Sequence, residues 1–292
     1  MKIPTGLEWW RDKPGGADWL DRLPRLAEEC AGLWSLRLGE PFEPASVSLV
    51  VPAVLPDGTG AVLKLNFPEP ESEQEADALA HWHGDGAVRL LAHDAEARAL
   101  VVERCEPGTS LWQVPDEDGA NRVAASVLRR LWREPSSGHG FRLLADEAAR
   151  WAEELPRRWE QLGRPFERGL LDEAVAALSE LGPDQAEQVV LHQDFHGGNV
   201  LLSARGWLAI DPKPLVGERE FDAASLLRDR RWELPRLDAG RVVRRRLDLL
   251  ASELELDRDR MRRWGIAHAL AWGVSDVKLE PDLIECARLL RP

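Results

Sequence analysis

The chain has 292 residues, of which 44% are hydrophobic and 30% charged, and this composition excludes a disordered or fibrous protein and leaves room for two domains. Its 51 acidic residues outnumber its 38 basic ones, and the net charge of −13 argues against a nucleic-acid backbone as main ligand but suits a cationic small molecule. No apolar run approaches the ~20 residues of a membrane helix. The three scattered cysteines and the lack of a secretory signal at the start predict a cytoplasmic protein.

The first hundred residues predict a small lobe rich in β-structure. Val47–Val51 and Ala61–Leu65 are short apolar runs, and the turn-rich residues 56–60 between them are typical of a hairpin. A helix is expected to end near His83. A further strand is expected over Ala99–Arg104.

The remaining chain predicts a larger, mainly helical lobe. Five segments show helical periodicity: Arg122–Trp132, Ala145–Trp159, Leu170–Leu181, Val242–Leu254 and Met261–Trp272. One β-rich stretch, Val189–Asp211, interrupts them. The sequence therefore predicts an α+β fold with two lobes, residues 1–104 and residues 105–292.

The most informative part of the chain is this β-rich stretch. An apolar strand at 189–191 leads into a polar loop that contains Asp194 and ends in two glycines. Asn199 then opens a second strand, and a third strand ends on Asp211, so a hairpin is expected to bring these two side chains to the same end of adjacent strands. One carboxylate beside an Asn/Asp pair suits phosphoryl transfer, because Asp194 can orient an acceptor hydroxyl while the pair holds Mg²⁺ on nucleotide phosphates.

The five-position spacing of that aspartate and asparagine matches the protein-kinase catalytic loop. The form His-x-Asp-x-His-x-Gly-Asn-Val-Leu at 192–201 resembles the aminoglycoside phosphotransferase family. The continuation at 208–217, ahead of Phe221-Asp222, looks like its streptomycin/hydroxyurea phosphotransferase branch. The resemblance extends from about Val47 to Trp272. It implies a bilobal protein-kinase-like fold with ATP and Mg²⁺ as cofactors. It also implies transfer of phosphate to a hydroxyl of a small polar acceptor. The acceptor favoured by the resemblance is a streptomycin-like aminoglycoside, and the implied role is antibiotic resistance.

A kinase of this type needs a lysine in the β-rich lobe to contact the nucleotide phosphates, paired with a helical glutamate. Lys64 lies on a mostly apolar strand, where a lysine needs a partner unless it faces solvent. Glu75 matches the family pattern, but Ser72 and Glu75 also form a capping box, which would explain the glutamate structurally. The neighbouring Glu71 and Glu73 could substitute as partners.

Further expectations come from the resemblance. Residues 101–108 resemble the kinase hinge, in which the Glu103 carbonyl and the Cys105 amide would bind the adenine edge. The glycine-rich phosphate loop of protein kinases is absent from the sequence. Residues 44–47, which include Ser46, stand in its place. Asp222 is expected to open a helix, either as a cap or as an anchor for the catalytic-loop backbone.

Three alternatives remain open. His192, Asp194 and His196 alternate, so on an extended segment they would face one side as metal ligands of a metallohydrolase do. An inactive nucleotide-binding protein would lack one of the three catalytic side chains, all of which are present. A metabolic kinase would act on an amino sugar, a choline-like compound or an amino-acid hydroxyl. Acidic residues that could bind such an acceptor are Glu147, Glu153, Asp276, Glu280 and Asp282.

Overall fold

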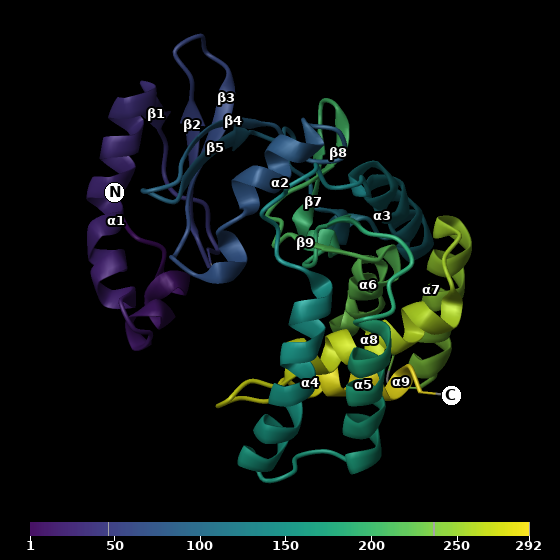
Figure 1. Ribbon diagram of the computed structural model, residues 1–292. Coiled ribbons are helices and arrows are strands. Elements are labelled where there is room, and N and C mark those ends of the chain that lie inside the picture. Colours follow the sequence, from purple (N-terminus) through teal and green to yellow (C-terminus); the bar gives the residue numbers. More distant parts are fainter. Residues whose placement is uncertain (46, 236, 292) are drawn as a thin grey trace. The chain divides into compact units, whose positions relative to one another are not determined.

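The computed structural model describes residues 1–45, 47–235 and 237–291 (Figure 1). Ser46, part of the segment that stands where protein kinases have a glycine-rich loop, lies outside the described residues. The chain packs into two compact units: Met1–Gly108 with Leu202–Leu208, and Thr109–Leu201 with Ala209–Pro292. None of the helices in the described part of the chain has the length and apolar character needed to cross a bilayer.

The first unit is built on a five-stranded antiparallel sheet in the order β1-β2-β3-β5-β4. Its strands are β1 (Arg37–Leu38), β2 (Leu49–Val54), β3 (Gly60–Leu65), β4 (Leu90–Asp94) and β5 (Ala99–Glu103). Lys64 on β3 lies between Val50 and Leu100 of the neighbouring strands. The predicted strands are confirmed, and β1 and β4 extend the sheet on its two edges.

The helices of the first unit differ from the expectation of a single helix. Besides α2 (Glu75–Trp82), the described residues form α1 (Gly16–Trp34) and two 3-10 turns, η1 (Thr5–Asp12) and η2 (Pro70–Ser72). Pro24 lies inside α1. An internal proline removes a helical hydrogen bond, so the sequence of this segment argues against a continuous helix. Tertiary packing compensates for this loss, because the buried face of α1 belongs to the same hydrophobic core as β2 and β3.

The second unit is mainly helical, as predicted. Its helices are α3 (Glu117–Leu131), α4 (Leu144–Gln161), α5 (Arg168–Leu181), α6 (Arg219–Ala224), α7 (Ala239–Leu254), α8 (Arg258–Gly273) and α9 (Pro281–Leu289). Short 3-10 turns are η3 (Leu111–Gln113), η4 (Gly197–Asn199), η5 (Ser225–Arg228) and η6 (Arg231–Glu233). Helix α8 packs against α5, α6, α7 and α9, and most of its residues from 264 to 270 are buried, so it forms the centre of this unit (Figure 1).

The β-rich stretch of the second half folds back on itself. β6 (Val189–Leu191) pairs antiparallel with β9 (Leu215–Gly217), and the hairpin of β7 (Val200–Ser203) and β8 (Gly206–Ala209) lies between them in sequence. Because Leu191 lies opposite Leu215, the segments that follow β6 and precede β9 start from adjacent positions. This pairing brings the catalytic-loop region and the segment around Asp211 to one place. It was not predicted from the sequence.

Candidate active site

Asp222 anchors the start of the polar loop. It is fully buried on α6, where its Oδ2 accepts the backbone N–H of His192 (3.1 Å) and the indole N–H of Trp132 (3.0 Å). Its Oδ1 accepts the backbone N–H of Gln193 (2.8 Å). The prediction of a loop anchor is confirmed, whereas the cap is wrong because α6 begins earlier, at Arg219.

Asp222→Ala should destabilise the protein, because it leaves three N–H donors without their acceptor. The backbone N–H groups of His192 and Gln193 are buried, whereas the Trp132 indole is half-buried. Each buried donor costs ~1–3 kcal/mol, so we expect the free energy of unfolding to fall by at least ~2 kcal/mol. Urea unfolding would measure the change. The exposed Asp172→Ala is the control and should stay within ~0.5 kcal/mol of wild type. An unchanged urea midpoint for the Asp222 variant would show that these bonds do not hold the loop.

His192 connects the loop to the segment around Asp211. Its Nε2 donates to the carbonyl of Ile210 (2.9 Å), and its own carbonyl accepts the backbone N–H of Lys213 (3.0 Å). Asp211 lies between these two bonds and has a φ of +58°, in the left-handed region. A non-glycine residue holds this conformation only where its surroundings impose it, so His192 and the β6–β9 pairing fix the place of Asp211.

Asn199 and Asp211 lie at the same end of the β7–β8 hairpin, as expected. The backbone N–H of Ile210 donates to the carbonyl of Asn199 (2.9 Å), so the residue before Asp211 pairs directly with Asn199. The Asn199 side chain is buried, and its Nδ2 donates to the backbone carbonyl of Asp194 (3.0 Å). This bond uses the amide nitrogen, so Oδ1 is the Asn199 atom that suits a metal. Amide and carboxylate oxygens, the chemistry of Asn199 and Asp211, are ligands that Mg²⁺ prefers.

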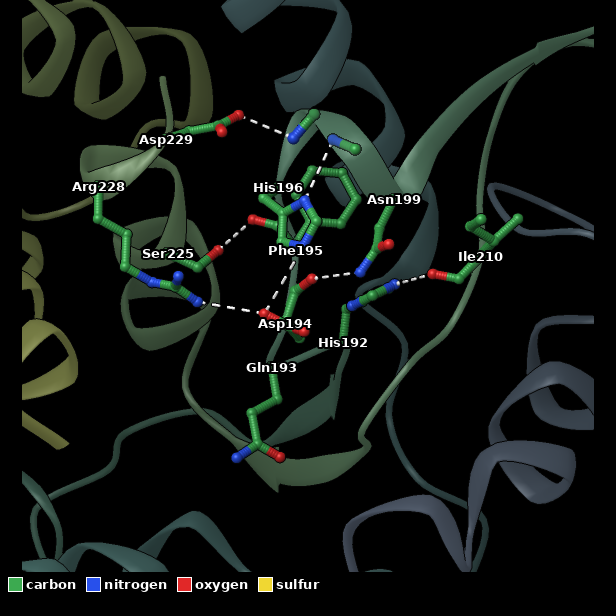
Figure 2. Close-up of polar contacts among 12 residues, drawn as sticks. His192, Gln193, Asp194, Phe195, His196, Asn199, Ile210, Ser225, Arg228 and Asp229 are labelled. Atoms are coloured by element: carbon green, nitrogen blue, oxygen red, sulfur yellow. Dashed lines mark hydrogen bonds and ion pairs between the residues drawn. The ribbon is translucent and has the colours of Figure 1, made fainter. Parts of the chain in front are cut away.

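Asp194 lies beside Asn199 with its side chain 18% exposed (Figure 2). Arg228 Nη2 donates to its Oδ1 at 3.2 Å, and His196 Nε2 is 3.9 Å from the same oxygen. Burial opposes ionisation, but nearby positive charge outweighs it and holds the pKa of Asp194 well below its ordinary value. Burial also lowers the pKa of His196, and the positive charges of Arg228 and Lys213 help to keep the Asp194 carboxylate ionised.

One helical face, formed by α6 and η5, makes hydrogen bonds to the polar loop at three positions. After Asp222, the hydroxyl of Ser225 donates to the carbonyl of Phe195 (2.5 Å). Arg228 follows with its bond to the Asp194 carboxylate (Figure 2). Residues 222, 225 and 228 are three positions apart, so they share one side of a helical turn. Sequence reasoning identified only the first of them, although this spacing was visible.

Trp112, on η3, covers the glycine end of the loop. Its ring stacks on the His196 imidazole with centroids 4.9 Å apart, and its Nε1 donates to Asp229 Oδ1 (2.6 Å). The other oxygen of Asp229 accepts the backbone N–H of Gly197 (2.7 Å). A Cβ atom on Gly197 or Gly198 would come within 2.6 or 2.7 Å of Trp112. The two glycines are therefore needed for close packing against this indole.

The metallohydrolase alternative loses its basis in this geometry. His192 uses Nε2 to bind a backbone carbonyl, and His196 uses Nδ1 to accept the backbone N–H of Gly198 (3.1 Å). Within residues 1–45, 47–235 and 237–291, no three His, Cys, Asp or Glu side chains gather as a metal-binding group. The two histidines of the loop thus have structural contacts.

Lys64 and Glu75 form an ion pair in the first unit. Lys64 Nζ lies 2.7 Å from both carboxylate oxygens of Glu75, and the two residues are only 6% and 2% exposed. Asn66 Nδ2 adds a bond to Glu75 Oε2 (2.8 Å). The capping-box interpretation is wrong, because the N-cap of α2 is Gln74 and the Ser72 hydroxyl lies near the carbonyls of Phe67 and Glu69. A solvent-facing Lys64 is excluded by its burial.

Glu103 and Cys105 also lie in the first unit, at the end of β5 and just beyond it. Arg205, at the tip of the β7–β8 hairpin, donates through Nε to Glu103 Oε1 (2.8 Å) and through Nη1 to the carbonyl of Gly84 (2.8 Å). These contacts explain why the hairpin tip packs with the first unit. Burial and the charge of Glu103 raise the pKa of the Cys105 thiol to about 11, so this thiol is uncharged near neutral pH.

Three of the acidic residues considered for acceptor binding are already paired with cations. Glu147 binds Arg142 (2.9 Å), Asp276 binds Arg157 (2.8 Å), and Lys278 lies 2.5 Å from Glu280. An acceptor cation would have to displace these partners. Glu147 is the least exposed of them, whereas the pairs of Asp276 and Glu280 lie at the surface, where an ion pair is worth little.

A β-rich unit with a buried Lys–Glu pair and a helical unit with this Asp, Asn and Asp arrangement define a protein-kinase-like phosphotransferase. The sequence profile of the family described as "Aminoglycoside/hydroxyurea antibiotic resistance kinase" matches residues 34–278. The chain belongs to this family, and the resemblance drawn from its motifs is confirmed.

Similar proteins agree with this assignment. A streptomycin 6-kinase of Streptomyces griseus is 39% identical over 301 residues, which cover 99% of this chain and 97% of that protein. A hydroxyurea phosphotransferase of Kitasatospora aureofaciens is 36% identical over 285 residues, 94% of this chain and 81% of that protein. The crystal structure of a choline/ethanolamine kinase family protein from Mesorhizobium loti superposes with a TM-score of 0.63 at 13% identity, over 91% of this chain and 95% of that one. The last similarity shows the fold alone.

Proposed function

We propose that this protein transfers the γ-phosphoryl group of ATP to a hydroxyl of a small polar molecule, with streptomycin as the first acceptor to test. The observation that carries the proposal is the position of Asp194, held through its backbone by Asn199 and through its side chain by Arg228. An ionised, oriented carboxylate at this point suits an acceptor hydroxyl. Full-length similarity to a streptomycin 6-kinase supports the acceptor.

In the proposed reaction Asp194 accepts a hydrogen bond from the acceptor hydroxyl and then its proton. The acceptor oxygen forms a bond to the γ-phosphorus while the bond from that phosphorus to the departing ADP oxygen breaks. The lowered pKa of Asp194 keeps the carboxylate ionised, so it is ready to take this hydrogen bond near neutral pH. Its role is to orient the hydroxyl as well as to receive the proton.

Asn199 and Asp211 are the proposed Mg²⁺ ligands. Their fit rests on the oxygens described above, because the Asn199 amide nitrogen is already bound to a backbone carbonyl. When bound, Mg²⁺ would neutralise charge on the nucleotide phosphates. The β7–β8 hairpin and His192 supply the rigidity that such ligands need, since they fix the backbone on both sides of Asp211.

For the nucleotide, we propose that Lys64 contacts the phosphates and that Glu75, itself bound by Asn66, holds the ammonium group in place. A buried lysine requires a hydrogen-bonded partner, and Glu75 meets that requirement with both oxygens near Nζ. The backbone carbonyl of Glu103 and the backbone amide of Cys105 are proposed to bind the adenine edge. The uncharged Cys105 thiol fits a position that acts through its backbone.

A second acceptor has specific support. The chain is 36% identical to a hydroxyurea phosphotransferase, so hydroxyurea belongs in the same test. The net charge of −13 favours a cationic acceptor over this neutral one. Amino sugars, choline-like alcohols and amino-acid hydroxyls complete the comparison as acceptors of metabolic kinases.

The experiment is a screen of acceptor-dependent ADP formation with ATP and Mg²⁺. Streptomycin should give the highest kcat/KM in a panel that also contains hydroxyurea, other aminoglycosides, amino sugars and amino alcohols. Mass spectrometry of the acceptor should show one added phosphoryl group. A higher kcat/KM for hydroxyurea or for an amino alcohol would change the substrate, and no phosphorylated acceptor in the whole panel would contradict the proposal.

Lys64→Ala should lower turnover by ~10²-fold, because removing one positioned donor at a charged reaction centre costs this much. Glu75→Gln should lower turnover in the same direction through the loss of the lysine's partner. Both changes break a buried pair, which costs ~3–5 kcal/mol of stability, so rates must be expressed per folded protein.

The matched control is Ser72→Ala, which alters the other member of the supposed capping box. Its hydroxyl does not contact Glu75, so turnover should stay close to that of wild type. Steady-state kinetics and thermal melts separate the two effects. Near-normal turnover of folded Lys64→Ala would reject the proposed role of the lysine.

A further inference from the structure

Arg228 lies at the end of η5, is only 8% exposed, and reaches the proposed catalytic carboxylate. Its Nη2 donates to Asp194 Oδ1 at 3.2 Å. Two residues of α8 also contact this guanidinium. Arg228 Nε donates to His268 Nδ1 (3.1 Å), and the central guanidinium carbon lies 5.7 Å from the ring centroid of Trp272. Helix α8 thus sets the direction in which Arg228 meets Asp194.

His268 is arranged to hold an arginine. Because its Nδ1 accepts from Arg228, its proton lies on Nε2, which faces the carbonyl of Gln193 at 3.4 Å. The imidazole stacks on Trp272 with centroids 4.2 Å apart and planes 12° apart. Burial and the nearby Arg228 charge hold the pKa of His268 well below its ordinary value, so it stays neutral and able to accept this bond.

The contact between Arg228 and Asp194 is one-sided. Arginine and carboxylate commonly pair through two parallel hydrogen bonds, which use both carboxylate oxygens. Here Arg228 binds Oδ1 alone, and His196 lies closest to that same oxygen. Both the Arg228 hydrogen bond and the His196 contact fall on Oδ1, and the positive charge of Lys213 acts on the carboxylate as a whole. Arg228 therefore orients the carboxylate through Oδ1.

We infer that Arg228 is a positioning residue for phosphoryl transfer: it binds Oδ1 of Asp194 and thereby directs Oδ2 toward the acceptor hydroxyl. The inference rests on the proposed function, because it takes Asp194 as the group that receives that hydroxyl. Asn199 fixes the Asp194 backbone, and Arg228 fixes the remaining rotation of its side chain. A carboxylate that loses this orientation misplaces the acceptor, and a misplacement of ~1 Å costs ~10²-fold in rate.

A double-mutant cycle tests whether Arg228 acts through Asp194. Arg228→Met should lower kcat for acceptor phosphorylation by ~10²-fold while KM for ATP changes by less than ~3-fold. In an Asp194→Asn background, the same Arg228→Met change should cost less than ~3-fold, because the carboxylate it positions is gone. Losses that multiply in the double variant would overturn the inference.

Two further variants separate positioning from folding. Arg228→Lys keeps the charge but loses the guanidinium fork, so it should recover part of the rate lost in Arg228→Met. Arg260→Met is the control, since Arg260 is on α8, like His268 and Trp272, and binds the buried Glu218. Its kcat per folded protein should match wild type, with folded fractions taken from thermal melts. A kcat for Arg260→Met as low as that for Arg228→Met would indicate a general effect of α8 stability.

The outcome distinguishes this inference from the proposed function. If wild type phosphorylates an acceptor and Arg228→Met retains its kcat, the inference about Arg228 fails and the function stands. If wild type phosphorylates no acceptor, the function fails, and the four proteins of the cycle are compared in Mg²⁺-dependent hydrolysis of ATP by water. Independent effects of the two residues on that rate would overturn the positioning role as well.

Discussion

Asp194→Asn should lower turnover on the acceptor by ~10²–10⁴-fold, the usual contribution of a positioned general base. The substitution keeps the shape of the side chain but removes its charge and basicity. Because the pKa of Asp194 is held well below its ordinary value, the wild-type group is fully ionised near neutral pH, so the whole effect is expected there. Steady-state kinetics with saturating ATP would measure it.

The affinity for ATP and Mg²⁺ should change little in this variant, since Lys64, Asn199 and Asp211 are the proposed nucleotide and metal contacts. Asp172→Asn, the same substitution on the exposed surface of α5, is the matched control and should leave turnover unchanged. A folded Asp194→Asn protein with near-normal acceptor phosphorylation would reject the assignment of Asp194.

Asn199→Ala and Asp211→Ala should each lower Mg²⁺-dependent turnover by at least ~10²-fold, because a bound metal contributes several kcal/mol of charge stabilisation. Both variants should also require more Mg²⁺ to reach half of their maximal rate. Titration of Mg²⁺ at fixed ATP would measure this shift. The fold should survive, because the β6–β9 pairing and the Asp222 anchor do not depend on either side chain.

Asn121→Ala is the control for the asparagine, since this buried amide on α3 is outside the catalytic loop. Chelation should stop the wild-type reaction, and Mg²⁺ should restore it without zinc. Stoichiometric, tightly bound zinc together with activity that is indifferent to Mg²⁺ would instead support the metallohydrolase alternative.

The catalytic loop and the Lys64–Glu75 pair could be predicted because their evidence is local. Asp194 and Asn199 lie five positions apart in a short loop, and Lys64 and Glu75 are eleven positions apart on consecutive elements. A buried lysine on an apolar strand needs an acid. Several acids follow within residues 69–77, and the family pattern singled out Glu75 among them. Motif spacing and the family resemblance were sufficient for these parts, and helical periodicity was sufficient for the main helices.

Other parts depend on long-range packing that no local pattern reveals. Ser72 and Glu75 have the complete sequence pattern of a capping box. In the structure Glu75 is instead buried and paired with Lys64. His268 lies forty positions from Arg228, so nothing in the local sequence links that histidine to the loop. Helix α1 was missed because its internal proline argues against a helix, whereas core packing supports one.

The geometry also explains the residue types of the loop beyond its chemistry. His192 fixes the backbone around Asp211, and the two glycines make room for Trp112. Asp229 then joins that indole to the loop backbone. These residues of the motif thus depend on contacts with other elements, so the motif alone indicates the reaction but not how its groups are held.

A single reaction mixture tests the proposed chemistry most directly: purified protein, ATP, Mg²⁺ and streptomycin, with ADP and phosphorylated streptomycin measured together over time. Transfer to a hydroxyl predicts that the two products accumulate in equal amounts, that chelation stops both, and that Asp194→Asn slows both by the same factor. ADP formed without phosphorylated streptomycin, both with streptomycin and with every other acceptor in the panel, would contradict it.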